Sequence, residues 1–314
     1  MSIAASSRNT APKIVMIGGG TGSFTLLSTL KHYAKNITSI VNMVDDGGST
    51  GMLRDELGVL PPGDVRQCIV ALSNAPMAMR ELFNYRFPSG KLKGHSFGNL
   101  FLTAVEKQTD NFAEAVEMAS RVLNITGKVV PVTLDKTTLV LKDSGRTIKG
   151  EYKIGHAKLK KQRPEISLKP KASINPEARK AILEADLIVI APGNLYGSIA
   201  PALIVDGVRQ AILESDAKLV DVVNLVTKPG QTDGFSVNDF VMETERFIAP
   251  GRVDYALYNN KKPAKELLKK YTEDGEYPVK FDTKVLEKAH CKAIGDDFHS
   301  RAASAKKVDK TIRR

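Results

Sequence analysis

The feature that most constrains this chain is an apolar run that ends in four glycines within five residues. The run "KIVMI" (13–17) precedes Gly18, Gly19, Gly20, Thr21, Gly22 and Ser23, and a helical pattern, "FTLLSTLKHY", follows. A tight turn needs only one or two glycines, whereas several of them permit positive φ and let the backbone approach a ligand closely. The N–H groups that open a helix attract anions. This stretch therefore predicts a strand, a turn and a helix that bind a phosphate or pyrophosphate, although it is neither a Walker A loop nor a complete GxGxxG motif.

The rest of the chain alternates short apolar strands with amphipathic helices. Strands are expected at 13–17, 37–44, 187–191, 217–223 and 253–258. Such alternation predicts an α/β fold with a mostly parallel sheet and helices on both faces. The stretch of about 127–175 instead alternates polar and apolar residues around a "DSGR" turn, which predicts a small antiparallel β insertion. We expect one domain at 13–300, a disordered leader at 1–12 and a basic tail at 301–314.

Charge is unevenly distributed. The chain carries a formal net charge of +11, and residues 128–171 contribute 12 Lys and Arg against 4 Asp and Glu, a balance of +8. Tyr152 is the one aromatic residue in that stretch, so a base-stacking platform is unsupported. A solvated lysine-rich surface is favoured over a polyanion site, and nucleic acid is not an expected partner.

Two features of the sequence bear on the cellular compartment: the lengths of its apolar runs and the spacing of its cysteines. No apolar run approaches the roughly 20 residues that a membrane-spanning helix needs, so we expect no membrane span. Cys68 and Cys291 form no CxxC pair and are interpreted as reduced thiols in a cytoplasmic protein.

A second loop of acids and glycines follows the strand at 37–44. It comprises Asp45, Asp46, Gly47, Gly48 and Ser49. An acid at this point of a dinucleotide-binding fold contacts a ribose hydroxyl, and two adjacent carboxylates can also hold Mg²⁺ beside a phosphate. An Asp-rich turn that bonds its own backbone is the structural alternative. The choice between metal and hydroxyl stays open.

Further polar residues stand near helix starts and strand ends. Asp64, with Gln67 three residues on, has the character of a helix N-cap, and Arg66 is a candidate phosphate partner. His95 and Asn99 lie at the start of the next helix, in the stretch "KGHSFGNLFL". Amides and hydroxyls at successive strand ends suit the recognition of a sugar, a base edge or ribose hydroxyls. Those residues are Pro192, Gly193, Asn194, Leu195, Tyr196, Asn224, Thr227 and Asn259.

Catalytic signatures are absent from the sequence. We find no GxSxG elbow, no HExxH and no Cys/His metal cluster. No catalytic residue is assigned, and the sequence predicts binding more clearly than turnover.

Several of these motifs, in this order, resemble one family. They are "GGGTGS", "DDGGSTGMLRDELGVLPPGDVRQCIVALSN", "GHSFGNLFLTA", "PGNLYGSIAPAL" and "NLVTKPGQTDGF". The chain resembles the superfamily of 2-phospho-L-lactate transferases, and within it the bacterial gluconeogenesis factors, from about Lys13 to Phe298. The resemblance implies a Rossmann-like fold and a cytoplasmic protein that binds nucleotide-diphosphate sugars, UDP-N-acetylglucosamine above all. It also implies a role in cell shape and cell-wall metabolism during gluconeogenic growth, a homo-oligomer, and cell-wall synthesis proteins as partners.

The resemblance carries its loops onto Gly18–Ser23, Asp45–Ser49, Pro62–Arg66, Pro192–Tyr196 and Asn224–Thr227. Gln67, Asn194 and the run "GQTDGF" depart from the family pattern, which bears on ligand specificity more than on the fold. The transferase branch uses Mg²⁺ to join a phosphorylated lactyl or enolpyruvyl group to a deazaflavin alcohol. We rank that activity below regulatory binding, and an NAD-binding protein, suggested by the first loop alone, below both.

Overall fold

The structure is a computed structural model that describes residues 11–160 and 163–299. The basic tail and all but two residues of the predicted leader lie outside the described residues.

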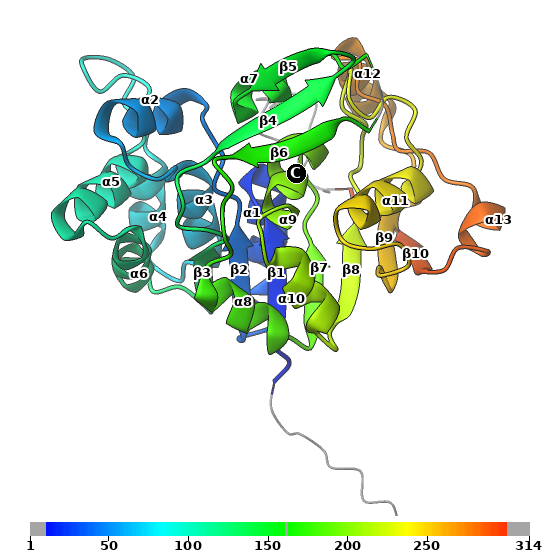
Figure 1. Ribbon diagram of the computed structural model, residues 1–314, viewed down its shortest axis with the longest axis horizontal. Helices are drawn as coiled ribbons and strands as arrows, with labels where there is room; N and C mark the ends of the chain where they lie inside the picture. Colours follow the sequence, from blue (N-terminus) through cyan, green and yellow to red (C-terminus); the bar gives the residue numbers. More distant parts are fainter. Residues whose placement is uncertain (1–10, 161–162, 300–314) are drawn as a thin grey trace, which may run out of the picture.

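A seven-stranded parallel sheet forms the centre of the molecule (Figure 1). Its strand order is β10-β9-β8-β7-β1-β2-β3, and every neighbouring pair is parallel. All five residues of β1 are buried, which explains why the first strand reads as a continuous apolar run. The strands are β1 Ile14–Gly18, β2 Ile37–Val41, β3 Lys128–Pro131, β7 Leu187–Ile190, β8 Lys218–Val222, β9 Tyr255–Asn259 and β10 Lys292–Asp296.

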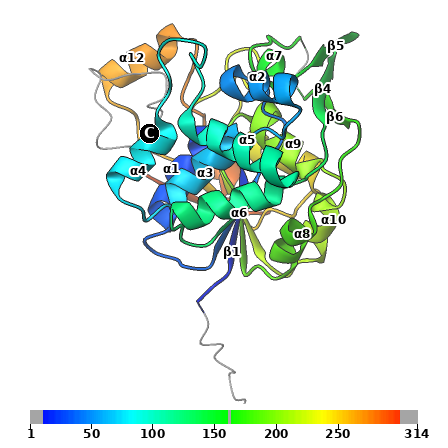
Figure 2. The same cartoon turned by 90° about the vertical axis from the view of Figure 1, so that its left-hand side faces the viewer.

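Helices cover both faces of this sheet, as the alternating pattern predicts. Figure 2 shows α1 (Gly20–Leu30), α3 (Gly63–Leu72) and α4 (Met77–Asn84) on one side, and α8 (Pro176–Leu183) and α10 (Val208–Glu214) on the other. The remaining helices of the main domain are α2 Gly48–Leu57, α5 Phe97–Thr109, α6 Phe112–Val122, α9 Ala200–Leu203, α11 Val237–Phe247, α12 Lys265–Glu273 and α13 Thr283–Leu286. A short π-helix, η1 (Leu195–Ile199), follows β7.

The antiparallel insertion is present but smaller than predicted. It consists of β4 (Thr138–Asp143), β5 (Arg146–Lys149) and β6 (Glu165–Lys169), in the order β5-β4-β6. The predicted range of 127–175 wrongly includes β3, which pairs with β2 in the main sheet because Val129 and Val130 are buried there. Figure 1 shows the insertion above the carboxyl ends of the central strands.

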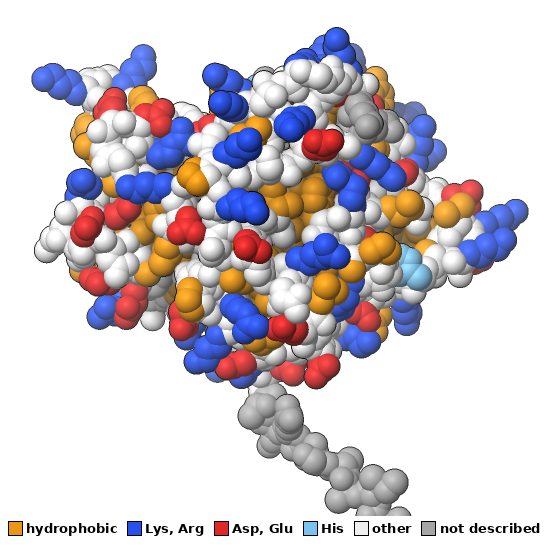
Figure 3. All heavy atoms as spheres, in the orientation of Figure 1, with side chains coloured by type: hydrophobic (Ala, Val, Ile, Leu, Met, Phe, Trp, Pro, Cys, Tyr) orange, Lys and Arg blue, Asp and Glu red, His pale blue; other side chains and the backbone are white. Residues whose placement is uncertain are grey.

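A short helix interrupts the insertion where the alternating pattern predicts a strand. Gly150, at φ 94°, turns the chain out of β5, and α7 (Glu151–Gly155) follows. Ile154 is fully buried and fixes α7 against the domain. Basic side chains are frequent on the face of the insertion that Figure 3 shows, and acidic ones lie among them.

Candidate functional site

The carboxyl ends of three neighbouring strands bring three of the predicted loops to one edge of the sheet. Strand order runs outward from β1 to β3 on one side and from β7 to β10 on the other, so it reverses between β1 and β7. Ligands of open α/β sheets bind at such a reversal. The loops after β1, β2 and β7 therefore place Gly20, Asp46 and Gly193 at a common edge, which we call the loop edge.

Glycines are required in the first loop by close contacts. Gly20 begins α1 at φ 68°. A Cβ at Gly22 would lie 1.8 Å from the carbonyl oxygen of Pro192. One at Gly19 would lie 2.3 Å from Oδ2 of Asp64. The loops after β1 and β7 thus touch through their backbones. Ser23 is buried and donates its hydroxyl to the carbonyl of Gly19.

Asp64 lies at the N-terminus of α1, where a phosphate was expected. Its carboxylate accepts the backbone N–H of Gly20. The prediction that Asp64 is the N-cap of its own helix is wrong, because Pro62 has that position. Asp64 lies in the first turn of α3 and faces the glycine loop. Burial raises the pKa of Asp64 well above its usual value, and Asp45 and Glu151 raise it further.

The two acids of the second loop point to different neighbours. Asp45 accepts the N–H of Gly47 at 3.0 Å, and a Cβ at Gly63 would lie 2.6 Å from its Oδ2. Burial raises the pKa of Asp45. Asp46 instead accepts the N–H of Tyr152 at 2.6 Å and lies 3.8 Å from the guanidinium of Arg54. Asp46 therefore holds the insertion, while Asp45 faces Asp64.

Glu151, the first residue of α7, is a site residue that sequence reasoning missed. Burial raises the pKa of Glu151 to about 7, with further contributions from Asp45 and Asp46, while Lys228 opposes them. Asp45, Asp64 and Glu151 come from the β2 loop, α3 and the insertion, and together we call them the acidic cluster. The one hint in the sequence is that Glu151 is one of 4 acids within the basic stretch 128–171.

A second polar network lies beside the acidic cluster. Ser49 bonds His95 through Nδ1 at 3.1 Å and accepts the side-chain amide of Asn99 at 3.2 Å. Arg66 donates from Nε to Asn99 at 3.0 Å and from Nη1 to Asn84. Burial lowers the pKa of Arg66 to about 10, with Arg86 adding to the effect, so the guanidinium stays charged at neutral pH. Its Nη2 has no hydrogen-bond partner within the described residues, which leaves one fork of Arg66 free to contact an anion.

Other predicted site residues hold the loops rather than face a ligand. Asn224 clamps Gly193, accepting its N–H and donating to its carbonyl, both at 2.8 Å. Thr227 is buried and exchanges hydrogen bonds with the backbone of Tyr277. Leu195 and Tyr196 belong to the core.

Asn259 is separated from the loop edge. It ends β9, three strands from β1 and hence about 14 Å away. Its side chain accepts the N–H of Phe298 at 3.0 Å. The structure therefore does not bring Asn259 together with the three loops.

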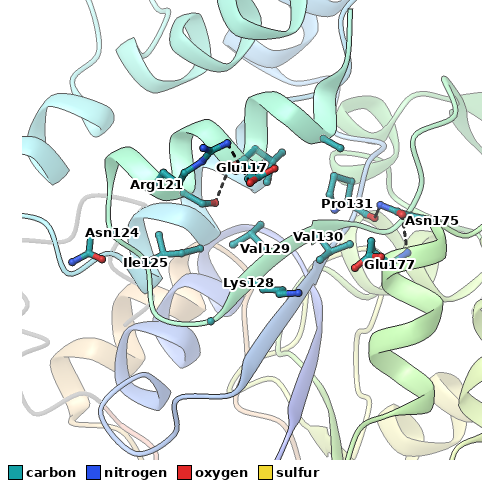
Figure 4. A pocket seen from close by; sticks show the side chains of 14 residues that line it. Glu117, Arg121, Asn124, Ile125, Lys128, Val129, Val130, Pro131, Asn175 and Glu177 are labelled. Atoms are coloured by element: carbon teal, nitrogen blue, oxygen red, sulfur yellow. Dashed lines mark hydrogen bonds and ion pairs between the residues drawn. The ribbon is translucent and has the colours of Figure 1, made fainter. Parts of the chain in front are cut away.

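Two cavities lie at the outer edges of the sheet. One of about 650 Å³ lies between α6, β3 and the start of α8 (Figure 4), where the side chain of Asn175 bonds the carbonyl of Pro131. The other, of about 520 Å³, lies by β10 and is lined by Tyr258, His290 and Cys291 among others. No predicted site residue lines either cavity.

The described residues contain neither a three-residue metal cluster nor a membrane-spanning helix. No three His, Cys, Asp or Glu side chains within 11–160 and 163–299 are arranged to hold a metal ion between them. No helix in this part of the chain is long and apolar enough to cross a membrane.

Comparison with known proteins gives consistent matches. The family model of 2-phospho-L-lactate transferase CofD matches residues 14–299. A protein of Clostridium acetobutylicum is 45% identical over 91% of this chain and 64% of its own length, and one of Bacillus subtilis 168 is 39% identical over 91% of each. The names of both call them gluconeogenesis factors. This chain thus spans less than two thirds of the Clostridium acetobutylicum relative.

Solved structures agree on the fold. The crystal structure of a protein from Bacillus halodurans superposes with a TM-score of 0.88 at 38% identity and covers 92% of this chain and 93% of that one. The α/β architecture, the order of the motifs and these likenesses converge on one assignment. The chain belongs to the 2-phospho-L-lactate transferase CofD family, among relatives named gluconeogenesis factors.

Proposed function

We propose that this protein is a cytoplasmic regulator that binds a nucleotide-diphosphate sugar at the loop edge. The observation that supports it is the reversal of strand order between β1 and β7, where backbone-only turns meet the acidic cluster and the free fork of Arg66. In this proposal the diphosphate lies along the turns at Gly18–Ser23 and Gly193. UDP-N-acetylglucosamine is the ligand that the family resemblance favours.

A divalent cation fits this arrangement on chemical grounds. Asp45 and Asp64 are buried acids whose charges oppose each other, so an anionic diphosphate would meet repulsion unless a cation lay between. Mg²⁺ is commonly held by one or two carboxylates together with substrate phosphates and water. We assign Asp45 and Asp64 to hold it. Asp46, the other acid expected to bind metal, is engaged by Tyr152 and Arg54.

Calorimetry with UDP-N-acetylglucosamine and Mg²⁺ tests the proposal. We expect binding to the wild-type protein and loss of binding for Gly20→Val, because a β-branched side chain at φ 68° strains the turn and obstructs the backbone approach. Leu57→Ala, on the exposed end of α2, is the control for handling and fold. Unchanged affinity in a folded Gly20→Val protein would contradict the placement.

A cellular role follows from the same proposal. We expect deletion of the gene to alter cell shape and cell-wall metabolism during growth on gluconeogenic carbon sources. Complementation by the wild-type gene but not by Gly20→Val would link that role to the site. Pull-down of cell-wall synthesis proteins and light scattering of the purified chain address the expected partners and homo-oligomer.

The second candidate is a Mg²⁺-dependent phosphotransferase, favoured by the family match itself. Asp45 would then help to hold the cation that stabilises charge on the transferred group. Incubation with nucleotide-linked phosphoesters and Mg²⁺, with Asp45→Asn as the control, is the test. Product that requires both Mg²⁺ and Asp45 would replace regulatory binding with catalysis.

A further inference from the structure

Three side chains converge on Gly197 in η1, and the missing side chain there is what lets them meet. A Cβ at Gly197 would lie 2.5 Å from Nδ2 of Asn194 and 2.5 Å from Oε1 of Glu151. Asn42, just after β2, donates its Nδ2 to the carbonyl of Gly197 at 3.3 Å. The three side chains come from loops after β2 and β7 and from the insertion, and we call them the Gly197 corner.

Acceptors in the Gly197 corner lack donors. Asn42 is 2% exposed, and its Oδ1 has no hydrogen-bond partner. Oδ1 of Asn194 is likewise buried and without a partner. Within the described residues no hydrogen bond to the Glu151 carboxyl is formed. A buried polar atom left without a partner costs about 1–3 kcal/mol, and a donor group of a bound molecule would remove that cost.

The chemistry of these atoms selects the part of the ligand that fits. Phosphate oxygens at neutral pH are acceptors, and they match the N–H groups of the glycine turn and the fork of Arg66. Amide and carboxylate oxygens instead need O–H or N–H donors. A sugar supplies several hydroxyl donors, whereas a diphosphate supplies none.

Resting on the proposed function, we infer that Asn42, Asn194 and Glu151 read the hydroxyl groups of the sugar and so determine sugar specificity. Both amide oxygens are covered by protein atoms, so a hydroxyl reaches them only after η1 shifts. The turn is suited to this, because Asn194 accepts both the i+4 bond from Ser198 at 2.8 Å and the i+5 bond from Ile199 at 3.1 Å. Single π-turns of this kind are frequent at functional sites.

Calorimetry with two probes separates sugar reading from phosphate binding. UDP and UDP-glucose are titrated, each with Mg²⁺, into the full chain and its variants. We expect Glu151→Ala and Asn194→Ala to weaken the binding of UDP-glucose at least tenfold more than the binding of UDP. Glu151→Gln, which keeps an acceptor oxygen, should retain most of the affinity. Lys153→Ala, on the exposed side of α7, is the matched control and should leave both ligands unchanged.

Hydrogen exchange gives a readout that does not depend on affinity. The amides of Leu195–Ile199 should gain more protection with UDP-glucose than with UDP, and Glu151→Ala should remove the difference.

Each outcome bears on one of the two proposals. Equal losses for both ligands would assign these residues a structural role, and no loss for either would exclude them from the site. Both results overturn the inference while leaving diphosphate binding intact. A wild-type protein that binds neither these probes nor UDP-N-acetylglucosamine would instead overturn the proposed function, and with it this assignment.

Discussion

At the scale of single residues, several buried carboxyl groups have a raised pKa because burial disfavours their charged form. Asp221 on β8 is an example away from the loop edge: it is 4% exposed, and its Oδ2 has no partner. Burial raises its pKa to about 7 from 3.8, Glu245 adds to the rise, and a hydrogen bond from Thr244 opposes it. Burial raises the pKa of the nearby thiol of Cys291, and Glu245 and Asp221 add to that rise. Such a group makes stability depend on pH.

The sign for Asp221 follows from its raised pKa. The folded chain binds this proton more tightly than the unfolded chain, so the stability it contributes is complete below about pH 3.8 and is lost as pH rises through about 7. We expect Asp221→Asn to flatten this dependence. The free energy of unfolding of the variant minus that of the wild type should rise by about 2–4 kcal/mol between pH 4 and pH 8. Urea titrations at several pH values measure it.

The matched control for that series is Asp186→Asn, at the residue just before β7, which is not among the groups that shift the pKa of Asp221. Its profile should keep the slope of the wild type over the same range of pH. A wild-type curve already parallel to that of Asp221→Asn would show that the buried carboxyl does not titrate between the two states.

At the scale of elements, the turns after β1 and β7 are joined through Gly22 and Pro192. A methyl group at Gly22 would lie 1.8 Å from a carbonyl oxygen, whereas one at Gly193 would meet its nearest neighbour, Ile199, at 3.4 Å, an ordinary contact. We expect Gly22→Ala to lower the free energy of unfolding by about 1–3 kcal/mol through overpacking. Gly193→Ala should change it by less than about 0.5 kcal/mol, as uncrowded substitutions usually do. Denaturant unfolding compares the two.

Gly193→Ala, which should hardly change stability, is expected to change ligand affinity. If the diphosphate lies on the Gly193 turn, Gly193→Ala should weaken it although the fold is unaffected. Similar stabilities for both variants would argue against a rigid contact between the two turns.

At the scale of the whole molecule, the electrostatic balance of the site predicts dependence on a cation. The acidic cluster and a diphosphate repel each other, so removal of Mg²⁺ with EDTA should reduce the affinity for UDP-N-acetylglucosamine at least tenfold. Asp45→Asn should be weaker with Mg²⁺ and lose most of the difference between Mg²⁺ and EDTA. Calorimetry in matched buffers measures both, and Glu117→Gln, at an exposed position of α6, is the control. Equal affinity in EDTA would remove Mg²⁺ from the proposal.

Much of the fold is readable from the sequence because its central strands are buried on both sides. Such strands are continuous apolar runs, as β1 and β7 show, and the predicted strands match within a few residues. Strand β10 is missed because it lies at an edge and alternates exposed and half-buried residues. Strand β3 is assigned to the insertion because sequence patterns do not show which sheet a strand joins.

The candidate site can be predicted only in part, because sequence patterns show local structure and not long-range contacts. Glycine turns and neighbouring acids are local patterns, so the loops after β1, β2 and β7 are predicted. Glu151 reaches them only because the insertion folds back over the loop edge, a long-range contact that no local pattern records. Asn224 and Thr227 are polar at the right strand ends, yet their hydrogen bonds go to backbone groups of neighbouring loops.

Asp64 has a consequence for the protein without its ligand. Its carboxyl group already accepts the first N–H of α1, at the place where a phosphate is expected. Because this N–H group already has a hydrogen-bond partner within the protein, the N-terminus of α1 does not need a bound phosphate to be stable. We therefore expect the protein without its ligand to be well folded and to persist in the cell. A regulator of this kind can respond to a low concentration of the nucleotide sugar as well as to a high one.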